Sequence, residues 1–163
     1  MQQHLLGSSK QPNPPRWPAS VRVFSPSDTD IEKVVHEAYR CNGRGEMYSN
    51  GEFSEQRFAF LFKPGRYTNL DLPVGYYTHV LGLGSTPDAV VFAGGKGVYS
   101  EASVPGMTLT TFWRSAENFK SGADHDWRGR GVRGMQWGTS QASPLRRVKV
   151  ARNLILHDEG RGG

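Results

Sequence analysis

The residue types best suited to chemistry gather in the stretch TFWRSAENF, residues 111–119. The Trp113 ring could stack on the apolar face of a sugar ring, while Arg114 and Glu117 bind its hydroxyl groups. Glu117 is a candidate general acid, provided that burial favours its protonated form. Glycoside hydrolysis by two carboxyl groups needs the second one about 5–9.5 Å away, and the sequence does not place it. In the competing interpretation, Asn118 lies in a turn and binds backbone groups, while Arg114 and Glu117 form an ion pair.

A second set of candidate binding residues lies in the apolar run 145–156. Because side chains alternate along a strand, Arg147 and Lys149 point to one face and their valine neighbours to the other. We therefore expect Arg147 and Lys149 to face solvent. Together with Gln141 they could hold an acidic sugar or supply the base of a lyase. In the competing interpretation, these basic side chains only keep the sheet soluble.

Side chains that could bind a metal do not have the spacing of a metal site. Asp124, His125 and Asp126 are consecutive, so a strand cannot turn all three toward one ion. A single cysteine, Cys41, excludes zinc ribbons and zinc fingers. The sequence also contains no P-loop, no dinucleotide-binding glycine motif and no nucleophile elbow. We therefore predict neither a metal nor a cofactor.

Positive charge is concentrated in one part of the chain. The formal net charge is +5. Most of the excess lies in residues 120–152, where basic side chains far outnumber the acidic ones. Such a segment indicates a polyanionic partner, either an acidic polysaccharide or a nucleic acid. The Arg/Gly segment 127–134, with Trp127 and Trp137 for base stacking, is an alternative RNA-binding element. Its three arginines are few for that role, so we expect a polysaccharide or glycan as partner and not a nucleic acid.

The elements that must position these residues are mostly strands. The 163 residues include 20 glycines and 10 prolines, a composition that disfavours a helix bundle. No apolar run approaches the roughly 18 residues that a membrane-spanning helix needs. One amphipathic helix is expected from residue 31 to Asn42-Gly43, with apolar residues at positions 31, 34, 35, 38 and 39 on one face. Thr29 and Glu32 have the spacing of a capping box at its start.

Short apolar segments separated by glycines predict strands at 20–24, 57–63, 70–74, 76–83, 89–93, 98–99, 107–113 and 145–156. None is joined to the next by the two-residue Asn-Gly or Asp-Gly links of tight hairpins. Many short strands without tight reversals predict an all-β parallel β-helix, with the helix covering its open end. The competing fold is an antiparallel sandwich with long loops.

The chain divides into two parts. Residues 1–19 contain four prolines and are expected to form an extended lead-in. They lack the basic and apolar regions of a signal peptide. Residues 20–163 are expected to form one domain, the N-terminal cap and the first turns of a parallel β-helix.

The order of these features resembles a known family. The helix, the strand RFAFLFK and the turn Pro64-Gly65-Arg66-Tyr67 resemble the entry of right-handed parallel β-helix proteins of the pectin-lyase-like superfamily. The stretches VGYYTHVLGLG, FWRSAENF and TSQASPLRRVKVARNLILHD resemble a microbial set of these proteins, often labelled coagulation-factor-type domain proteins or adenylyl cyclases. The similarity covers residues 17–159.

The resemblance implies a right-handed parallel β-helix with one N-terminal capping α-helix. Relatives continue beyond the equivalent of LILHD, so we expect this chain to be truncated at its C-terminal end. It implies an extracellular, carbohydrate-associated protein whose active relatives are glycoside hydrolases or polysaccharide lyases, this chain being an inactive or partial form. A non-catalytic glycan-binding or scaffold module is the alternative function.

Overall fold

The computed structural model describes residues 16–43, 51–101, 111–127, 129, 131–139, 141–158 and 161–162. Residues 1–15 of the expected lead-in lie outside these ranges, and the division into 1–19 and 20–163 stays a prediction. The helices are α1 (Ile31–Asn42) and the 3-10 helix η1 (Pro87–Ala89). The strands are β1 (Val21–Phe24), β2 (Phe58–Phe62), β3 (Gly65–Thr68), β4 (Asp71–Pro73), β5 (Thr78–Gly82), β6 (Val90–Ala93), β7 (Gly97–Tyr99), β8 (Ser115–Gly122), β9 (Gly134–Gln136), β10 (Leu145–Val150), β11 (Asn153–Ile155), β12 (His157–Asp158) and β13 (Arg161–Gly162).

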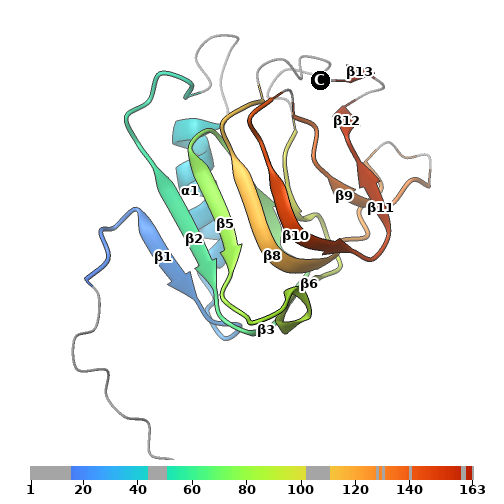
Figure 1. Cartoon of the computed structure of the whole chain (residues 1–163), viewed down its shortest axis with the longest axis horizontal. Helices are drawn as coiled ribbons and strands as arrows, with labels where there is room; N and C mark the ends of the chain where they lie inside the picture. The colour runs from blue at the N-terminus through green and yellow to red at the C-terminus, as the bar shows by residue number, and fades with distance from the viewer. Residues whose placement is uncertain are drawn as a thin grey trace, which may run out of the picture.

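Parallel pairing dominates the structure. A 7-stranded sheet has the order β1-β2-β5-β8-β6-β3, and β10 pairs with β8 outside this path. Two parallel pairs, β4 with β7 and β9 with β11, form separate small sheets, and β12 pairs antiparallel with β13. Figure 1 shows β1, β2, β5, β8 and β10 side by side, with α1 behind them.

Strand β8 pairs with three other strands of the large sheet, β5, β6 and β10. Its first half, Ser115 to Glu117, pairs with β5, and its second half, Lys120 to Gly122, pairs with β6. Between the halves Asn118 has a φ of 59°, a left-handed conformation that bends the strand. Strand β10 follows β8 along both halves. The bend therefore lets β8 pair with β5 along its first half and with β6 along its second half.

This arrangement corrects the predicted right-handed parallel β-helix. Across the described ranges the strands form one 7-stranded sheet joined through β8, with two-stranded sheets beside it, and not a β-helix solenoid. The prediction treated the apolar segments between glycines as successive strands of a β-helix. It missed β8 altogether, because SAENFKSG has only two apolar residues, Ala116 and Phe119, and therefore little apolar character. Of the strand expected at 107–113, residues 107–110 lie outside the described residues and 111–113 belong to no strand.

The core of the large sheet is built from phenylalanines on its inner face. Phe24, Phe62, Phe92 and Phe119 are each at most 1% exposed. The ring centroids lie 5.2 Å apart for Phe24 and Phe62, 4.9 Å for Phe62 and Phe92, and 5.1 Å for Phe92 and Phe119. Tilted and edge-to-face rings at these distances stabilise packing beyond the apolar area that they bury. This continuous row fixes the register of strands that are far apart in sequence.

The amphipathic helix is confirmed, but its predicted cap is wrong. Ile31, Val35, Ala38 and Tyr39 are buried, as the spacing of the apolar residues indicates. The residue at the N-cap is Asp30, and no side chain forms a capping hydrogen bond there. The expected capping box fails because the Glu32 carboxylate accepts a hydrogen bond from the backbone N–H of Asp71, at 2.6 Å. In the described part of the chain, no helix is long and apolar enough to cross a membrane.

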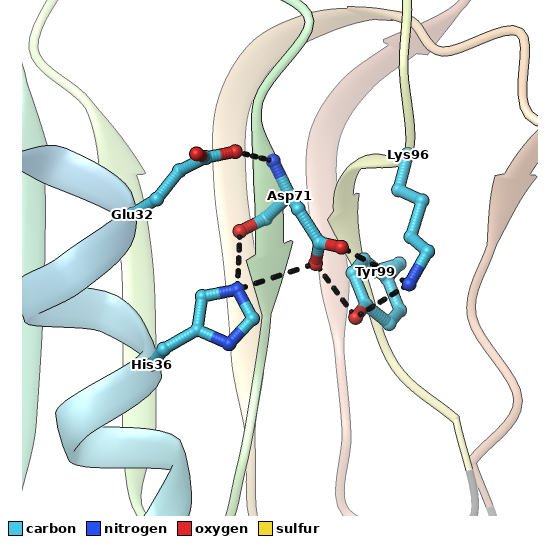
Figure 2. Close-up of polar contacts among 5 residues, drawn as sticks. All are labelled: Glu32, His36, Asp71, Lys96 and Tyr99. Atoms are coloured by element: carbon cyan, nitrogen blue, oxygen red, sulfur yellow. Dashed lines mark hydrogen bonds and ion pairs between the residues drawn. The ribbon is translucent and has the colours of Figure 1, made fainter.

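Asp71, the first residue of β4, connects α1 to β7 (Figure 2). Its carboxylate accepts a hydrogen bond from the Tyr99 hydroxyl at 2.8 Å and forms an ion pair with Lys96 at 3.0 Å. The His36 ring nitrogen Nε2 lies 3.1 Å from the Asp71 carbonyl oxygen. With the Glu32 contact, both the backbone and the side chain of Asp71 are held. Burial, followed by nearby carboxylates, raises the pKa of Tyr99 above its ordinary value.

Candidate functional site

Three side chains stack just before the beginnings of β2, β5 and β8. The rings of Tyr77 and Trp113 lie nearly parallel, with centroids 5.5 Å apart and an interplanar angle of 21°. The Arg57 guanidinium lies 3.6 Å from the centroid of the Tyr77 ring. The backbone N–H of Tyr77 donates to the Trp113 carbonyl oxygen at 2.6 Å. Because parallel strands begin side by side, residues distant in sequence form one platform.

The backbone of this platform adopts an uncommon conformation. Tyr77 and Trp113 both have a φ of 53°, and Ala142, which lies before β10, has a φ of 49°. A left-handed conformation costs a non-glycine residue roughly 1–2 kcal/mol. Such strain persists only where surrounding structure holds it, and it is concentrated at functional sites. The conformation leaves the Trp113 ring 46% exposed.

A shallow pocket of about 240 Å³ adjoins the platform. Its lining includes Tyr77, His79 and Trp113 together with Ala142 and Pro144 from the segment before β10. The volume is below the roughly 300–1,000 Å³ of pockets that enclose drug-sized ligands. The site therefore has the dimensions of a surface subsite, with an open aromatic ring as its largest apolar element.

A polar cluster on the outer face of the sheet continues from this pocket. His79 Nε2 lies 3.9 Å from a Glu117 carboxylate oxygen, and the other oxygen lies 2.9 Å from the Arg146 guanidinium. Burial lowers the pKa of His79 below its ordinary value, although Glu117 partly opposes that effect. The cluster therefore presents an imidazole, a carboxylate and a guanidinium in a row, which suits donors and acceptors on a polyhydroxylated ligand.

The structure brings together only some of the predicted site residues. Trp113 belongs to the platform and Glu117, four positions later in the sequence, belongs to the adjoining cluster. Arg114 is 4% exposed and donates to the Val74 carbonyl oxygen at 2.6 Å and to the Ser100 hydroxyl at 3.2 Å. Burial lowers the pKa of Arg114 to about 10. Arg114 is thus a buried residue whose hydrogen bonds hold the backbone next to Trp113 in place.

The basic residues of β10 lie elsewhere. Arg147 and Lys149 are exposed, as predicted, although the left-handed backbone of Arg147 interrupts the alternation and leaves Arg146 exposed as well. The Arg147 guanidinium donates to the Ser85 carbonyl oxygen at 3.1 Å, and Lys149 contacts both carboxylate oxygens of Asp88 at 3.0 Å. Gln141 is exposed in the loop before β10. Neither Gln141 nor the two basic residues line the pocket at Trp113.

The competing interpretation of this stretch is correct that Asn118 binds backbone groups, but wrong about the turn, because Asn118 lies within β8, and wrong about the ion pair. Asn118 lies at the bend of β8, and its amide donates to the carbonyl oxygens of Gly82 and Gly84 at 2.7 Å each. A Cβ atom at position 82 would collide with the Asn118 carbonyl oxygen, so only glycine fits there. Arg114 and Glu117 do not pair with each other, because one faces the interior and the other the outer face.

The two tryptophans proposed to stack on RNA bases pack against other residues of the protein. Trp137 is 3% exposed, and its indole N–H donates to the Ser143 carbonyl oxygen at 2.9 Å. Trp127 packs against Tyr99 with centroids 4.8 Å apart, and its N–H donates to the Gly134 carbonyl oxygen at 3.0 Å. Arg128 and Arg130 lie outside the described residues. Among the residues that are described, no group of three His, Cys, Asp or Glu side chains gathers as a metal site.

Sequence reasoning missed Tyr77 and His79. His79 could have been found, because it interrupts the apolar alternation THVLG on the outward parity. The residues that surround His79 could not have been found, because His79 pairs with Ser115, which is 36 positions away in the sequence. The sequence contains no signal for that register.

The sequence is similar to that of a characterised enzyme. It is 35% identical over 143 residues to an exo-β-1,3-glucanase of Streptomyces sp. (strain SirexAA-E / ActE). The aligned region covers 88% of this chain and 21% of the glucanase. No protein-family model matches the chain.

Solved structures show the same similarity. The structure of sacteLam55A from Streptomyces sp. SirexAA-E matches with a TM-score of 0.70 and 33% identity, over 88% of this chain and 24% of that one. A variant of sacteLam55A in complex with glucose matches with a TM-score of 0.70 and 31% identity, over 92% and 25% of the two chains. The chain thus spans about a quarter or less of the length of the relatives that it matches.

These similarities correct the expected family. The stretches that resembled the pectin-lyase-like superfamily, and the set labelled coagulation-factor-type or adenylyl cyclase, lie within a region that is similar to an exo-β-1,3-glucanase. Short motifs such as the Pro-Gly turn after a strand are common to many parallel-strand proteins. They therefore carried less information than the alignment over 143 residues does.

Proposed function

We propose that this chain binds β-1,3-glucan at the Trp113 platform, as a non-catalytic glycan-binding part of a glucan-degrading system. The observation that carries the proposal is the half-exposed Trp113 ring, stacked on Tyr77 beside a 240 Å³ pocket. The similarity to an exo-β-1,3-glucanase supports the choice of glucan.

The chemistry of the platform fits a neutral sugar. The exposed face of Trp113 offers an apolar surface for the C–H face of a pyranose ring, and the indole is held flat by Tyr77. Beyond the ring, His79, Glu117 and Arg146 offer donors and acceptors to hydroxyl groups. A rigid platform lowers the entropy that binding must overcome.

The contacts of Glu117 favour binding over general acid catalysis. Both side chains that pair with Glu117 within the described residues, Arg146 and His79, carry ring or guanidinium nitrogens. Hydrolysis with paired carboxyl groups needs a second carboxyl about 5–9.5 Å from the first. We therefore assign Glu117 to hydrogen bonding with the sugar in this proposal.

The test is binding to laminarin, a soluble β-1,3-glucan, measured by affinity electrophoresis and by titration of tryptophan fluorescence. Trp113→Ala should weaken binding at least tenfold, whereas Trp17→Ala should leave it unchanged. Trp17 is a matched control, because it is 55% exposed and lies outside the pocket. Equal binding by both variants and the parent chain would contradict the assignment of Trp113.

A catalytic role is the second candidate, favoured by the 35% identity to the exo-β-1,3-glucanase. It predicts glucose release from laminarin, abolished in Glu117→Gln with binding retained. The binding proposal predicts no release of reducing sugar by the parent chain.

An extracellular location stays a prediction, tested by fractionating the producing cells.

A further inference from the structure

A second groove lies on the outer face of β3, β6 and β8, at a distance from the Trp113 platform. Its volume is about 460 Å³. Its lining includes the small residues Ala93, Gly94 and Gly122. The polar residues Thr68 and Asn69 also line it.

Three cationic side chains line this groove: Arg66, Lys120 and Arg152, with Asp124 as the one acidic group. Lys120 is compensated by Asp88 at 3.6 Å. Within the described ranges, neither guanidinium has an ion-pair or hydrogen-bond partner in the protein. Two uncompensated guanidinium groups in one hollow create a local positive potential that attracts an anion.

The register of the strands sets the spacing of these charges. Arg66 is opposite Val91, and Val91 is opposite Lys120, so the two cations lie two strands apart, about 10 Å by sheet geometry. Arg152 follows β10, which pairs with β8 beyond Lys120. The cationic side chains are thus distributed across the groove. A ligand with several anionic groups matches this distribution better than a single small ion does.

We propose that this groove binds an acidic oligosaccharide, whose carboxylate or sulfate groups contact Arg66 and Arg152. A guanidinium binds planar and tetrahedral oxyanions with two parallel hydrogen bonds, which makes arginine well suited to both groups. Asp124 and Asn69 accept and donate hydrogen bonds to sugar hydroxyl groups. The residues that line the groove include no aromatic ring for base stacking, so a sugar suits it better than a single-stranded nucleic acid.

The test measures binding of trigalacturonate and of a heparin-derived tetrasaccharide to the whole chain by calorimetry and by NMR amide shifts. Arg66→Gln/Arg152→Gln should weaken the binding of at least one of them tenfold or more. Amide shifts should gather at Thr68, Ala93 and Gly122. The two ligands separate a carboxylate site from a sulfate site.

The matched control is Arg16→Gln/Arg133→Gln, which removes the same charge from two exposed arginines outside the groove. It should change affinity by less than twofold. Equal loss in both double variants would overturn the proposal in favour of unspecific charge attraction. Binding of inorganic phosphate or of a single-stranded oligonucleotide as tight as that of the oligosaccharides would also overturn it. Laminarin binding should persist in the groove variant, so this proposal and the glucan site fail separately.

Discussion

Asn118 on β8 and Arg147 on β10 lie opposite each other, and both residues have a left-handed backbone, with φ of 59° and 53°. Their neighbours pair in register, Arg146 with Glu117 and Val148 with Phe119. The bend of β8 is thus repeated by the next strand. Asn118 tolerates this conformation well, whereas arginine does not.

We expect Arg147→Asn to stabilise the protein by about 1 kcal/mol. The Asn118 side-chain oxygen is buried and has no hydrogen-bond partner among the described residues. An asparagine amide at position 147 could donate to it, as Asn118 itself donates to Gly82. Urea unfolding monitored by fluorescence would measure the change in the free energy of unfolding.

The variant Arg147→Gly separates the two causes of that stabilisation. Glycine relieves the left-handed conformation but supplies no donor, so it should stabilise less than asparagine does. Both substitutions remove the exposed contact of Arg147 to Ser85, which contributes little. A lower stability of Arg147→Asn than of Arg147→Gly would exclude the hydrogen bond to Asn118.

Glu32→Ala should destabilise the protein by about 1 kcal/mol, because it removes the acceptor for the Asp71 N–H. Glu37→Ala is the matched control, since Glu37 is exposed on the same helix and α1 keeps its length and apolar face. Thermal unfolding followed by circular dichroism would compare them. If the two variants unfold at the same temperature, the contact between Glu32 and Asp71 does not stabilise the attachment of α1.

Stability should fall in alkaline solution, because buried tyrosines keep their protons in the folded state. Burial, with a nearby carboxylate, raises the pKa of Tyr67 to about 12, and burial raises that of Tyr76 to about 12. The unfolded phenols ionise near pH 10, so between about pH 10 and 12 the folded state binds more protons and loses stability as pH rises. Absorbance at 295 nm should therefore rise together with unfolding.

Tyr67→Phe tests that assignment. It should flatten the decline above pH 10 and cost about 1–2 kcal/mol at neutral pH, because the Tyr67 hydroxyl donates to the Phe24 and Lys63 carbonyl oxygens. A decline of unchanged steepness would assign the alkaline transition to other groups.

The predictable part of the fold is the part that local sequence determines. The helix and most strands follow from periodicity, as the buried residues Ile31, Val35 and Phe62 show. Strand β8 could not be predicted from periodicity, because most of its side chains are small or polar. It is a strand because it pairs with β5, β6 and β10. Central strands with little apolar character are held by their neighbours, and a single sequence does not show which segments these are.

The same distinction applies to the candidate site. Trp113 and Glu117 could be selected by residue type, and the exposure of Lys149 follows from alternation with Val148 and Val150. The burial of Arg114 could not be predicted, because its partners, Val74 and Ser100, are 40 and 14 positions away. Residue type indicates the chemistry, and register decides which side chains meet.

The carboxylate of Glu117 influences the titration of His79. Burial lowers the pKa of His79, and the Glu117 carboxylate partly restores it, so Glu117→Gln should lower that pKa further. Because the folded pKa is depressed, the unfolded state binds more protons just below pH 6.5, and stability falls as pH decreases through that range. NMR titration of the His79 ring resonances would measure the pKa in both proteins. A higher pKa in Glu117→Gln would contradict the contact, and laminarin added to the titration should shift the His79 resonances if the sugar reaches the cluster beside the Trp113 platform.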